Sequence, residues 1–175
     1  MTSGPDTIWK FGELADSHDV VQFDCGVHAL NHWLKKFALQ NQQQNLSKTF
    51  VALPPANRRV MGFYSVCPGQ IDFQSLPKKE KAEPKYSRGV IRLARLAVDK
   101  SAHGRGLGSE LLVEALLRAY RVSREISTFG VVVDAKEGAR DFYLRYEFVP
   151  YFDVPSSLFL PMKTIERMLD KVGLK

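Results

Sequence analysis

Cysteine and long apolar runs are both scarce in this sequence. The two cysteines, Cys25 and Cys67, are too few for a fold built on disulfides. No segment offers the roughly twenty unbroken apolar residues of a membrane helix, and residues 1–10 contain no apolar run of the signal-peptide kind. We therefore expect a cytoplasmic protein with no membrane association, whose two thiols are buried and unpaired.

Apolar residues occur in the proportion of a packed globular protein. Of the 175 residues, 45% are hydrophobic and 11% are aromatic, which suits a real core and not a disordered chain. The length fits one domain, so residues 1–175 are predicted to form a single domain.

Basic residues are concentrated in one stretch. The formal net charge is +6, and between Lys78 and Arg105 nine Lys or Arg stand against three acidic residues, so this stretch carries the whole excess. Such a patch attracts phosphate groups, on a cofactor or on a nucleic acid. A solvated, lysine-rich surface loop is the alternative, and charge alone does not separate the two.

The spacing of apolar residues predicts strands and helices in a mixed order, typical of an α/β sandwich around one mixed sheet. The predicted strands are 7–14, 48–53, 59–66, 90–99, 129–133, 148–152 and 158–162. The predicted helices are 16–23, 26–42, 104–120, 137–146 and 163–171, and residues 68–89 form a long connection.

A glycine-rich turn joins the predicted strand 90–99 to the predicted helix 104–120. Its residues run His103-Gly104-Arg105-Gly106-Leu107-Gly108. Glycines let the backbone approach a ligand closely, and the first N–H groups of a helix have no partner within it. This predicts an anion site suited to a pyrophosphate, although a tight strand-to-helix connection would use the same residues. The spacing matches neither the P-loop nor the dinucleotide fingerprint.

At this turn the sequence resembles the GNAT acetyltransferase superfamily, whose signature is Gln or Arg, two residues, Gly, one residue, then Gly or Ala. His103 departs from the first position, which in the family acts largely through its backbone. The chain resembles most closely the GNAT toxins of bacterial toxin–antitoxin pairs. The segments that carry this resemblance are Phe23-Asp24-Cys25-Gly26, Leu30-Asn31-His32-Trp33-Leu34, 92–99, Val133-Asp134-Ala135, Phe142-Tyr143 and Leu158-Phe159-Leu160-Pro161-Met162.

The resemblance implies a GNAT fold, with a mixed, mostly antiparallel central sheet flanked by helices, and one N-acetyltransferase domain over residues 1–175. It implies acetyl-CoA as cosubstrate and no metal. Backbone groups of Leu96, Ala97 and Val98 would hold the pantetheine arm and thioester. The cofactor-binding residues that it implies at the turn are His103, Gly104, Arg105, Gly106, Leu107, Gly108 and Ser109.

Tyr143 lies where the family has its catalytic tyrosine. A tyrosine, titrating near 10, can donate a proton to a leaving thiolate whose thiol titrates near 8.5. Packing beside Phe142 is the alternative role, and Tyr146 is the local rival. Glu147 replaces the Gly that the family usually has before Phe148, which leaves the turn geometry there open.

A general base is not evident, because the predicted strand 90–99 offers Arg92 and Arg95 but no carboxylate before its end. Lysine acetylation needs a base, whereas an α-amine titrates near 8 and is already partly neutral. The missing base favours an α-amine acceptor, with Asp134, Glu137 or a water as the remaining candidates for a base.

The family resemblance implies that the acceptor is aminoacyl-tRNA, whose acetylation stops translation. The residues nominated for tRNA are Lys78, Lys79, Lys81, Lys85, Arg88, Arg92 and Arg95, with Lys35 and Lys36 as a second contact. It also implies a ribbon-helix-helix antitoxin partner and a homodimer. The alternatives are a GNAT enzyme acting on a small amine or a protein N-terminus, and a catalytically silent regulator.

Cys25, His28 and His32 lie on one face of the predicted helix 26–42, in a pattern that metal ligands can use. No second cluster supplies a further ligand, so an ordinary packed helix is expected rather than a zinc site. Cys67 has no His partner in the sequence and is expected to be structural.

Overall fold

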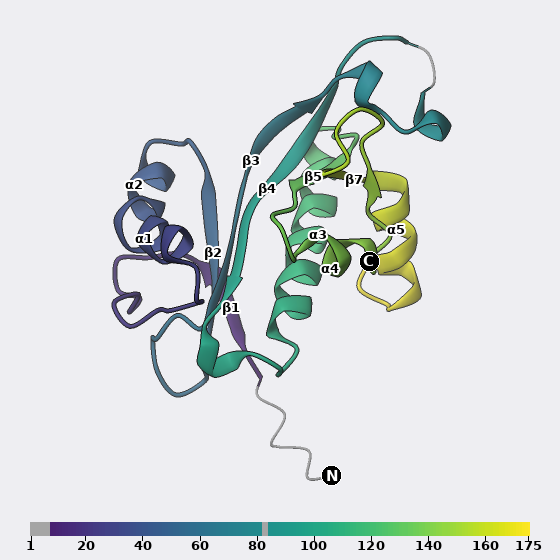
Figure 1. The fold of residues 1–175 in the computed structure, drawn as a ribbon. Helices are drawn as coiled ribbons and strands as arrows, with labels where there is room; N and C mark the ends of the chain where they lie inside the picture. The colour runs from purple at the N-terminus through teal and green to yellow at the C-terminus, as the bar shows by residue number, and fades with distance from the viewer. Residues whose placement is uncertain (1–7, 82–83) are drawn as a thin grey trace. The chain divides into compact units, whose positions relative to one another are not determined.

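The computed structural model describes residues 8–81 and 84–175, and its strands form one seven-stranded sheet (Figure 1). Within these ranges no helix is both long and apolar enough to cross a bilayer. In chain order the elements are β1 (Lys10–Glu13), α1 (His28–Lys36), α2 (Ala38–Gln43), β2 (Lys48–Leu53), β3 (Gly62–Ile71), η1 (Phe73–Ser75), η2 (Lys78–Glu80), β4 (Arg88–Val98), η3 (Lys100–Ala102), α3 (Leu107–Glu125), β5 (Gly130–Asp134), α4 (Arg140–Leu144), β6 (Val149–Pro150), β7 (Ser157–Pro161) and α5 (Met162–Lys171).

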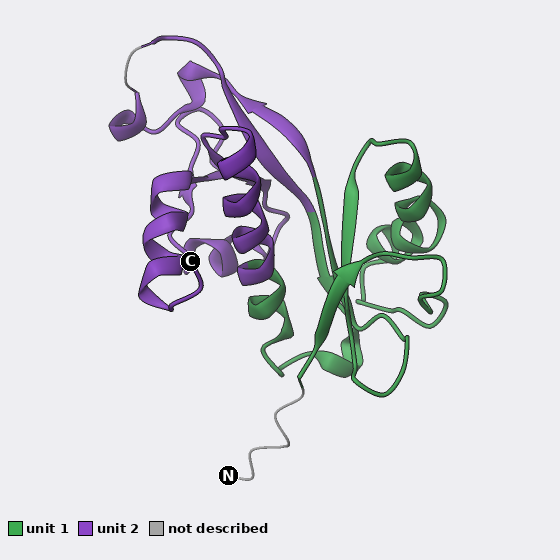
Figure 2. Ribbon diagram, turned by 180° about the vertical axis from the view of Figure 1, so that it is seen from behind, with its two compact units in different colours: residues 1–66, 95–112 green, residues 67–94, 113–175 purple. Residues whose placement is uncertain are grey.

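The sheet is mixed and mostly antiparallel, as predicted. Its strand order is β1-β2-β3-β4-β5-β7-β6. The pairs β1/β2, β2/β3, β5/β7 and β6/β7 are antiparallel, whereas β4 and β5 run parallel, with Ile91 opposite Val131 and Arg92 opposite Val132. By contacts the chain divides into unit 1, residues 1–66 and 95–112, and unit 2, residues 67–94 and 113–175 (Figure 2).

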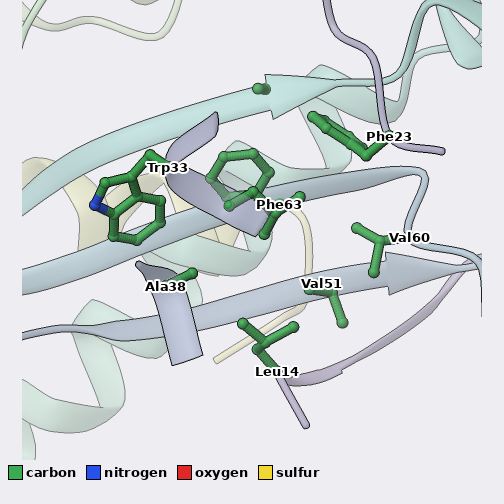
Figure 3. Close-up of a cluster of buried hydrophobic side chains, with 9 residues drawn as sticks. Leu14, Phe23, Trp33, Ala38, Val51, Val60 and Phe63 are labelled. Carbon is green, nitrogen blue, oxygen red and sulfur yellow. The ribbon is translucent and has the colours of Figure 1, made fainter. Parts of the chain in front are cut away.

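Unit 1 is built on an aromatic core (Figure 3). The rings of Phe23 and Trp33 pack on Phe63 at centroid distances of 5.5 and 6.0 Å, and Val51 and Val60 are fully buried beside them. Burial of side chains this large is the main stabilising contribution to such a unit.

Residues 16–23 do not form the predicted helix. Asp19 instead donates its N–H to Arg58 O at 2.8 Å and accepts from Val60 N at 2.9 Å, so this segment is bridged to the chain ahead of β3. Phe23 thereby enters the core, and its burial outweighs the local tendency to form a helix.

The predicted helix 26–42 is two helices, because the backbone at Phe37 leaves the helical range, with φ −121°. The break allows Gln42 of α2 to reach the interior. Its side chain donates to Leu14 O at 2.9 Å and accepts from Thr49 N at 3.1 Å, so a buried amide joins α2 to the residue after β1 and to β2. A buried amide with both ends satisfied is tolerated in a core.

Other elements match the predictions with shifted ends. β2 coincides with the predicted strand 48–53, and β1 falls within 7–14, of which Thr7 lies outside the described residues. β3 continues through Pro68 to Ile71, so the predicted long connection begins later. Ile71 is buried against Val90 in the core of unit 2, and this burial accounts for the extension.

Both cysteines are free, as predicted, but they are half-buried rather than buried. Cys25 lies in the segment before α1, where its Sγ is 3.7 Å from Val27 O. Cys67 lies in the part of β3 where inward and outward positions alternate.

Gly130, the first residue of β5, is a position where even a methyl group has no room. A Cβ would lie 2.3 Å from Leu160 O and 2.5 Å from the Phe159 ring. We expect Gly130→Ala to lower the free energy of unfolding by about 3 kcal/mol, because the backbone of β7 cannot move away without losing its hydrogen bonds to β5. Urea denaturation measures the loss. Gly12→Ala in β1, where a Cβ meets nothing within 4 Å, is the control, and equal losses in both variants would contradict this packing.

Candidate coenzyme turn and buried tyrosine

The glycine-rich turn leads from η3 into α3 and exposes its backbone. Gly104 and Gly106 have φ of +73° and +79°, a region that favours glycine. A Cβ at either residue would meet nothing within 4 Å, so the space above the turn is open to a ligand. Leu107, the first residue of α3, is buried and anchors the turn. Free N–H groups of a helix start beside open space fit a pyrophosphate.

The start of α3 is held close to β3 by Gly62. A Cβ there would lie 2.8 Å from Leu111 Cδ1 and 3.2 Å from Leu107 Cδ2, so a larger residue at this position would require the two leucine side chains to shift. The backbone of Ala97 is also near, with its O at 3.3 Å from that Cβ position. The sequence alone does not predict this close approach at Gly62, since an isolated glycine in a strand has several explanations.

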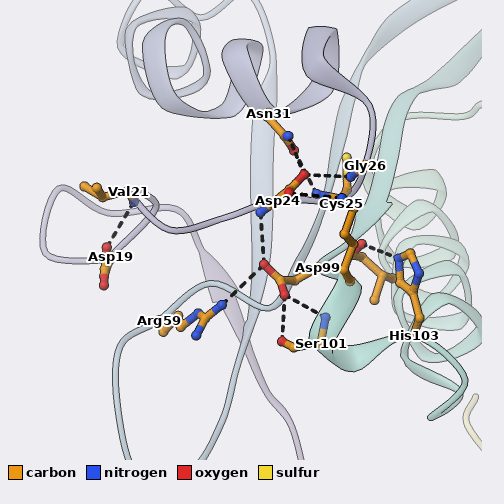
Figure 4. A network of polar contacts seen from close by, with 12 residues as sticks. Asp19, Val21, Asp24, Cys25, Gly26, Asn31, Arg59, Asp99, Ser101 and His103 are labelled. Carbon is orange, nitrogen blue, oxygen red and sulfur yellow. Dashed lines mark hydrogen bonds and ion pairs between the residues drawn. The ribbon is translucent and has the colours of Figure 1, made fainter.

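His103 and Arg105 use their side chains away from the turn's N–H groups. A ring nitrogen of His103 lies 2.8 Å from Val98 O (Figure 4). The guanidinium of Arg105 lies over the Trp9 ring at 5.0 Å. The replacement of Gln or Arg by His103 therefore leaves the backbone of the turn open.

The predicted coenzyme strand and turn belong to one unit. Leu96, Ala97 and Val98 end β4, and the whole segment from there to Ser109 lies in unit 1. Ala97 packs in the core of that unit, whereas His103, Gly104, Arg105 and Gly106 are exposed. A rigid strand followed by an exposed turn is a suitable support for a binding site.

Tyr143 is a buried residue of α4 in unit 2, with 6% of its surface exposed. Its ring makes edge contacts with Phe142 at 5.1 Å and Phe148 at 5.5 Å. Burial raises the pKa of Tyr143 to about 12. The hydroxyl is therefore protonated throughout the physiological range, as a proton donor requires. Tyr146 is more exposed and contacts Phe142 at 5.4 Å.

Glu147 adopts a left-handed conformation, with φ +64°, a region that favours glycine. Its carboxylate pairs with Arg167 of α5 at 2.6 Å, and both side chains are about half exposed. The turn before Phe148 is thus formed without glycine, at a backbone cost of roughly 1–2 kcal/mol.

Asp134 and Arg92 form an ion pair in unit 2, where β4 and β5 run parallel. Arg92 Nη1 lies 2.7 Å from Asp134 Oδ2, and Ser157 Oγ donates to Asp134 Oδ1 at 2.7 Å. Both carboxylate oxygens of Asp134 are therefore engaged by donors. Glu137 is exposed in the turn ahead of α4.

The nominated tRNA residues do not form one uniform surface. Lys78, Lys79 and Lys85 are exposed in unit 2, whereas Lys81 lies over the Phe152 ring at 4.4 Å. The other three are Arg88, over the Phe129 ring at 5.4 Å, Arg92, paired with Asp134, and Arg95 of unit 1, over the Trp33 ring at 4.0 Å. Two of the acidic residues between Lys78 and Arg105 are near these lysines in sequence. Glu83 lies outside the described residues, and Glu80 is buried, with its Oε2 3.1 Å from Lys163 Nζ.

His28 and His32 stack at a centroid distance of 5.9 Å on α1. In the part of the chain that the structure describes, no group of three or more His, Cys, Asp or Glu residues is arranged to hold a metal ion.

The comparisons with known proteins all indicate the same family. The model of the acetyltransferase (GNAT) domain matches residues 45–150. The tRNA-acetylating toxin of Mycobacterium tuberculosis is 34% identical over 157 residues, which cover 89% of this chain and 93% of that protein.

Two solved structures of AtaT are similar over nearly their whole length. AtaT complexed with acetyl-methionyl-tRNAfMet has a TM-score of 0.86 at 28% identity, covering 93% of this chain and 99% of that one. A tyrosine-to-phenylalanine mutant of AtaT, bound to the C-terminus of the antitoxin AtaR and acetyl-CoA, has a TM-score of 0.79 at 25% identity, covering 92% and 98%. The match to the family model, the homology and the shared fold together establish that this chain belongs to the GNAT acetyltransferases.

Proposed function

We propose that this protein is a toxin that transfers an acetyl group from acetyl-CoA to the α-amino group of aminoacyl-tRNA and so blocks translation. The observation that carries the proposal is the 34% identity to the tRNA-acetylating toxin over 89% of the chain. The AtaT complex with acetyl-methionyl-tRNAfMet supports the same class of acceptor. An acetylated α-amine is no longer a nucleophile for peptide-bond formation, which explains the block.

In this proposal acetyl-CoA supplies the acetyl group as a thioester. Leu96, Ala97 and Val98 bind the pantetheine arm through backbone groups, and residues 103–109 bind the pyrophosphate. The open space above Gly104 and Gly106 supports this assignment, as does the position of the turn at the start of α3, because the first N–H groups of a helix have no partner within it. Backbone donors do not depend on side-chain charge, so the site tolerates His103.

Tyr143 is the proposed proton donor. The amine nitrogen attacks the thioester carbonyl carbon, the new C–N bond forms, and the C–S bond breaks. The departing sulfur takes a proton from the Tyr143 hydroxyl, and the proton lost by the amine returns to the Tyr143 oxygen, directly or through water, so that the neutral tyrosine is restored. The raised pKa of Tyr143, about 12, keeps the hydroxyl protonated before each turnover.

The acceptor amine is proposed to react without a strong base. An α-amine titrates near 8, and the neighbouring ester of aminoacyl-tRNA lowers its pKa further, so a useful fraction is neutral at pH 7. The geometry of Asp134 supports this, because both of its carboxylate oxygens are already engaged by Arg92 and Ser157. Positioning then supplies most of the acceleration.

Lys78 and Lys79 are adjacent exposed residues of the proposed tRNA surface in unit 2. We expect the double variant Lys78→Ala with Lys79→Ala to weaken tRNA binding and to reduce the slope of log K against log salt by on the order of one per lost phosphate contact. Filter binding at several salt concentrations measures the slope. The control is Lys171→Ala, which changes an exposed lysine of α5. An unchanged slope in the double variant would show that Lys78 and Lys79 make no contact with tRNA phosphates.

The partners that we propose for this chain are inferred from the same relatives. An AtaT structure contains the C-terminus of its antitoxin, and we propose that this chain also has an antitoxin, of ribbon-helix-helix type. A flexible antitoxin tail laid over a basic surface would compete with tRNA. We further propose a homodimer, a cytoplasmic location, where charged tRNA is found, and one acetyltransferase domain over residues 1–175.

A cell-free translation reaction tests the proposed function. Addition of the protein with acetyl-CoA is expected to stop synthesis, whereas omission of acetyl-CoA, or use of Tyr143→Phe, leaves synthesis intact. Continued synthesis with active wild-type protein would exclude the toxin function and direct the search to small amines and protein N-termini.

A further inference from the structure

Two segments far apart in the sequence bind each other directly ahead of the glycine-rich turn. Asp24 N donates to Asp99 Oδ2 at 3.0 Å, and Lys100 N donates to Asp24 O at 2.8 Å (Figure 4). Lys100 Nζ also lies 3.3 Å from Asp24 Oδ2. The segment before α1 is therefore joined to the residues that follow β4 by reciprocal backbone and side-chain contacts within unit 1.

Each carboxylate of this junction is satisfied by further donors. Asp24 Oδ1 accepts from Gly26 N and from Asn31 Nδ2, both at 2.9 Å, and Asn31 Oδ1 accepts from Cys25 N at 2.9 Å. We call Asp24, Asn31, Asp99 and Lys100 the clasp.

Asp99 is the buried member of the clasp, with 3% of its surface exposed. Its Oδ1 accepts from Ser101 N at 2.9 Å and from Ser101 Oγ at 2.6 Å, and Arg59 Nη2 lies 3.6 Å from Oδ2. A carboxylate in this position requires such donors, because a buried charge without partners is costly. The partners explain why the chain carries an aspartate at the end of β4.

The clasp lies immediately before the exposed turn. Asp99 begins η3, Ala102 at its end is buried, and the exposed residues 103–106 follow. Residues that are exposed and carry two glycines with positive φ have many alternative conformations when unbound. Fixing the chain ahead of them reduces the entropy lost when they bind a ligand.

The clasp persists at the pH of any physiological assay. The N–H of Gly26, then the side chains of Asn31 and Lys100, lower the pKa of Asp24 to about 2. A lowered pKa means that the carboxylate stabilises the folded state above about pH 4, and that this contribution is lost as the pH falls towards 2.

We propose that Asp24 and Asn31 are positioning residues that hold the glycine-rich turn in its coenzyme-binding conformation. The inference rests on the proposed placement of the pyrophosphate at residues 103–109. It gives a physical role to the Phe23-Asp24-Cys25-Gly26 motif and to Asn31, neither of which touches the turn itself. Phe23 anchors the motif in the core, and the polar residues after it connect that core to the turn.

Binding of acetyl-CoA by calorimetry, without any acceptor, tests the clasp. Asp24→Ala is expected to raise the Kd for acetyl-CoA roughly tenfold. Asp24→Asn keeps an oxygen acceptor for Gly26 and Asn31 but loses the ion pair with Lys100, so its Kd should rise less than that of Asp24→Ala. The KM for acetyl-CoA should rise in parallel, while kcat at saturating coenzyme changes less than about twofold.

Asp19→Ala is the matched control. Asp19 makes the same kind of local contact in the same segment, with its Oδ1 accepting from Val21 N at 3.0 Å, but it does not bind residues 99–101 (Figure 4). Hydrogen exchange of residues 100–109 should accelerate in Asp24→Ala and not in Asp19→Ala.

Three results would overturn the proposal. They are wild-type Kd in Asp24→Ala, equal losses in Asp24→Ala and Asp19→Ala, and a lower kcat with unchanged Kd. Failure of the wild type itself to bind acetyl-CoA would refute the placement of the coenzyme and the role of the clasp together. Binding of acetyl-CoA without transfer to tRNA would refute only the proposed acceptor.

Discussion

Tyr143→Phe is expected to lower kcat by about 10²–10⁴-fold while the affinity for acetyl-CoA stays within twofold of the wild type. Only the hydroxyl is removed, and the edge contacts of the ring with Phe142 and Phe148 remain. Without a proton donor the sulfur must leave as a thiolate. Single-turnover rates with saturating acetyl-CoA measure the chemical step.

The matched control for this variant is Tyr146→Phe, which changes the neighbouring tyrosine that also contacts Phe142. A normal rate in Tyr143→Phe, or an equal loss in both variants, would remove Tyr143 from the mechanism. The pH profile is a second test. Because the pKa of Tyr143 is about 12, loss of its proton should not reduce the wild-type rate below pH 10, and the rate should rise through the pKa of the amine.

Gly106→Val is expected to lower the affinity for acetyl-CoA at least about 100-fold. The φ of +79° is unfavourable for a β-branched residue, and the new side chain would occupy the open space assigned to the pyrophosphate. Loss of the pyrophosphate contact and displacement of the backbone would both weaken the binding of acetyl-CoA. Calorimetry with acetyl-CoA measures the loss.

Gly173→Val separates backbone strain from blocking of the site. Gly173 also has a positive φ, +68°, and open space around its Cβ position, but it follows α5 in unit 2. Both variants should lose roughly 1–2 kcal/mol of stability. Only Gly106→Val should lose the coenzyme, and normal binding by that variant would contradict the placement of the pyrophosphate at this turn.

The features that the sequence could predict are those with a local signal. Gly104 and Gly106 mark the turn because positive φ favours glycine, and the apolar spacing after them marks α3. The short apolar run 129–133 predicts β5, which the structure places at Gly130–Asp134. The catalytic role of Tyr143 stays a prediction that rests on the family resemblance, since a buried tyrosine on a helix has no local signal for catalysis.

The features that escaped prediction depend on contacts between distant residues. The clasp joins Asp24 to Asp99, which are 75 residues apart, and Gln42 bridges Leu14 and Thr49. Residues 16–23 do not form the predicted helix, because pairing of Asp19 with the residues ahead of β3 and burial of Phe23 outweigh the local helix propensity. One local hint existed, since Asp99 followed by Ser101 is an aspartate that caps a short turn through its own side chain.

Transfer of labelled acetyl from acetyl-CoA to total charged tRNA tests the central claim most directly, with uncharged tRNA and Tyr143→Phe as controls. The account predicts label on charged tRNA alone, strongly reduced in Tyr143→Phe, and sequencing of the labelled pool would name the acceptor. Absence of label from a wild-type protein that binds acetyl-CoA would contradict the proposed acceptor.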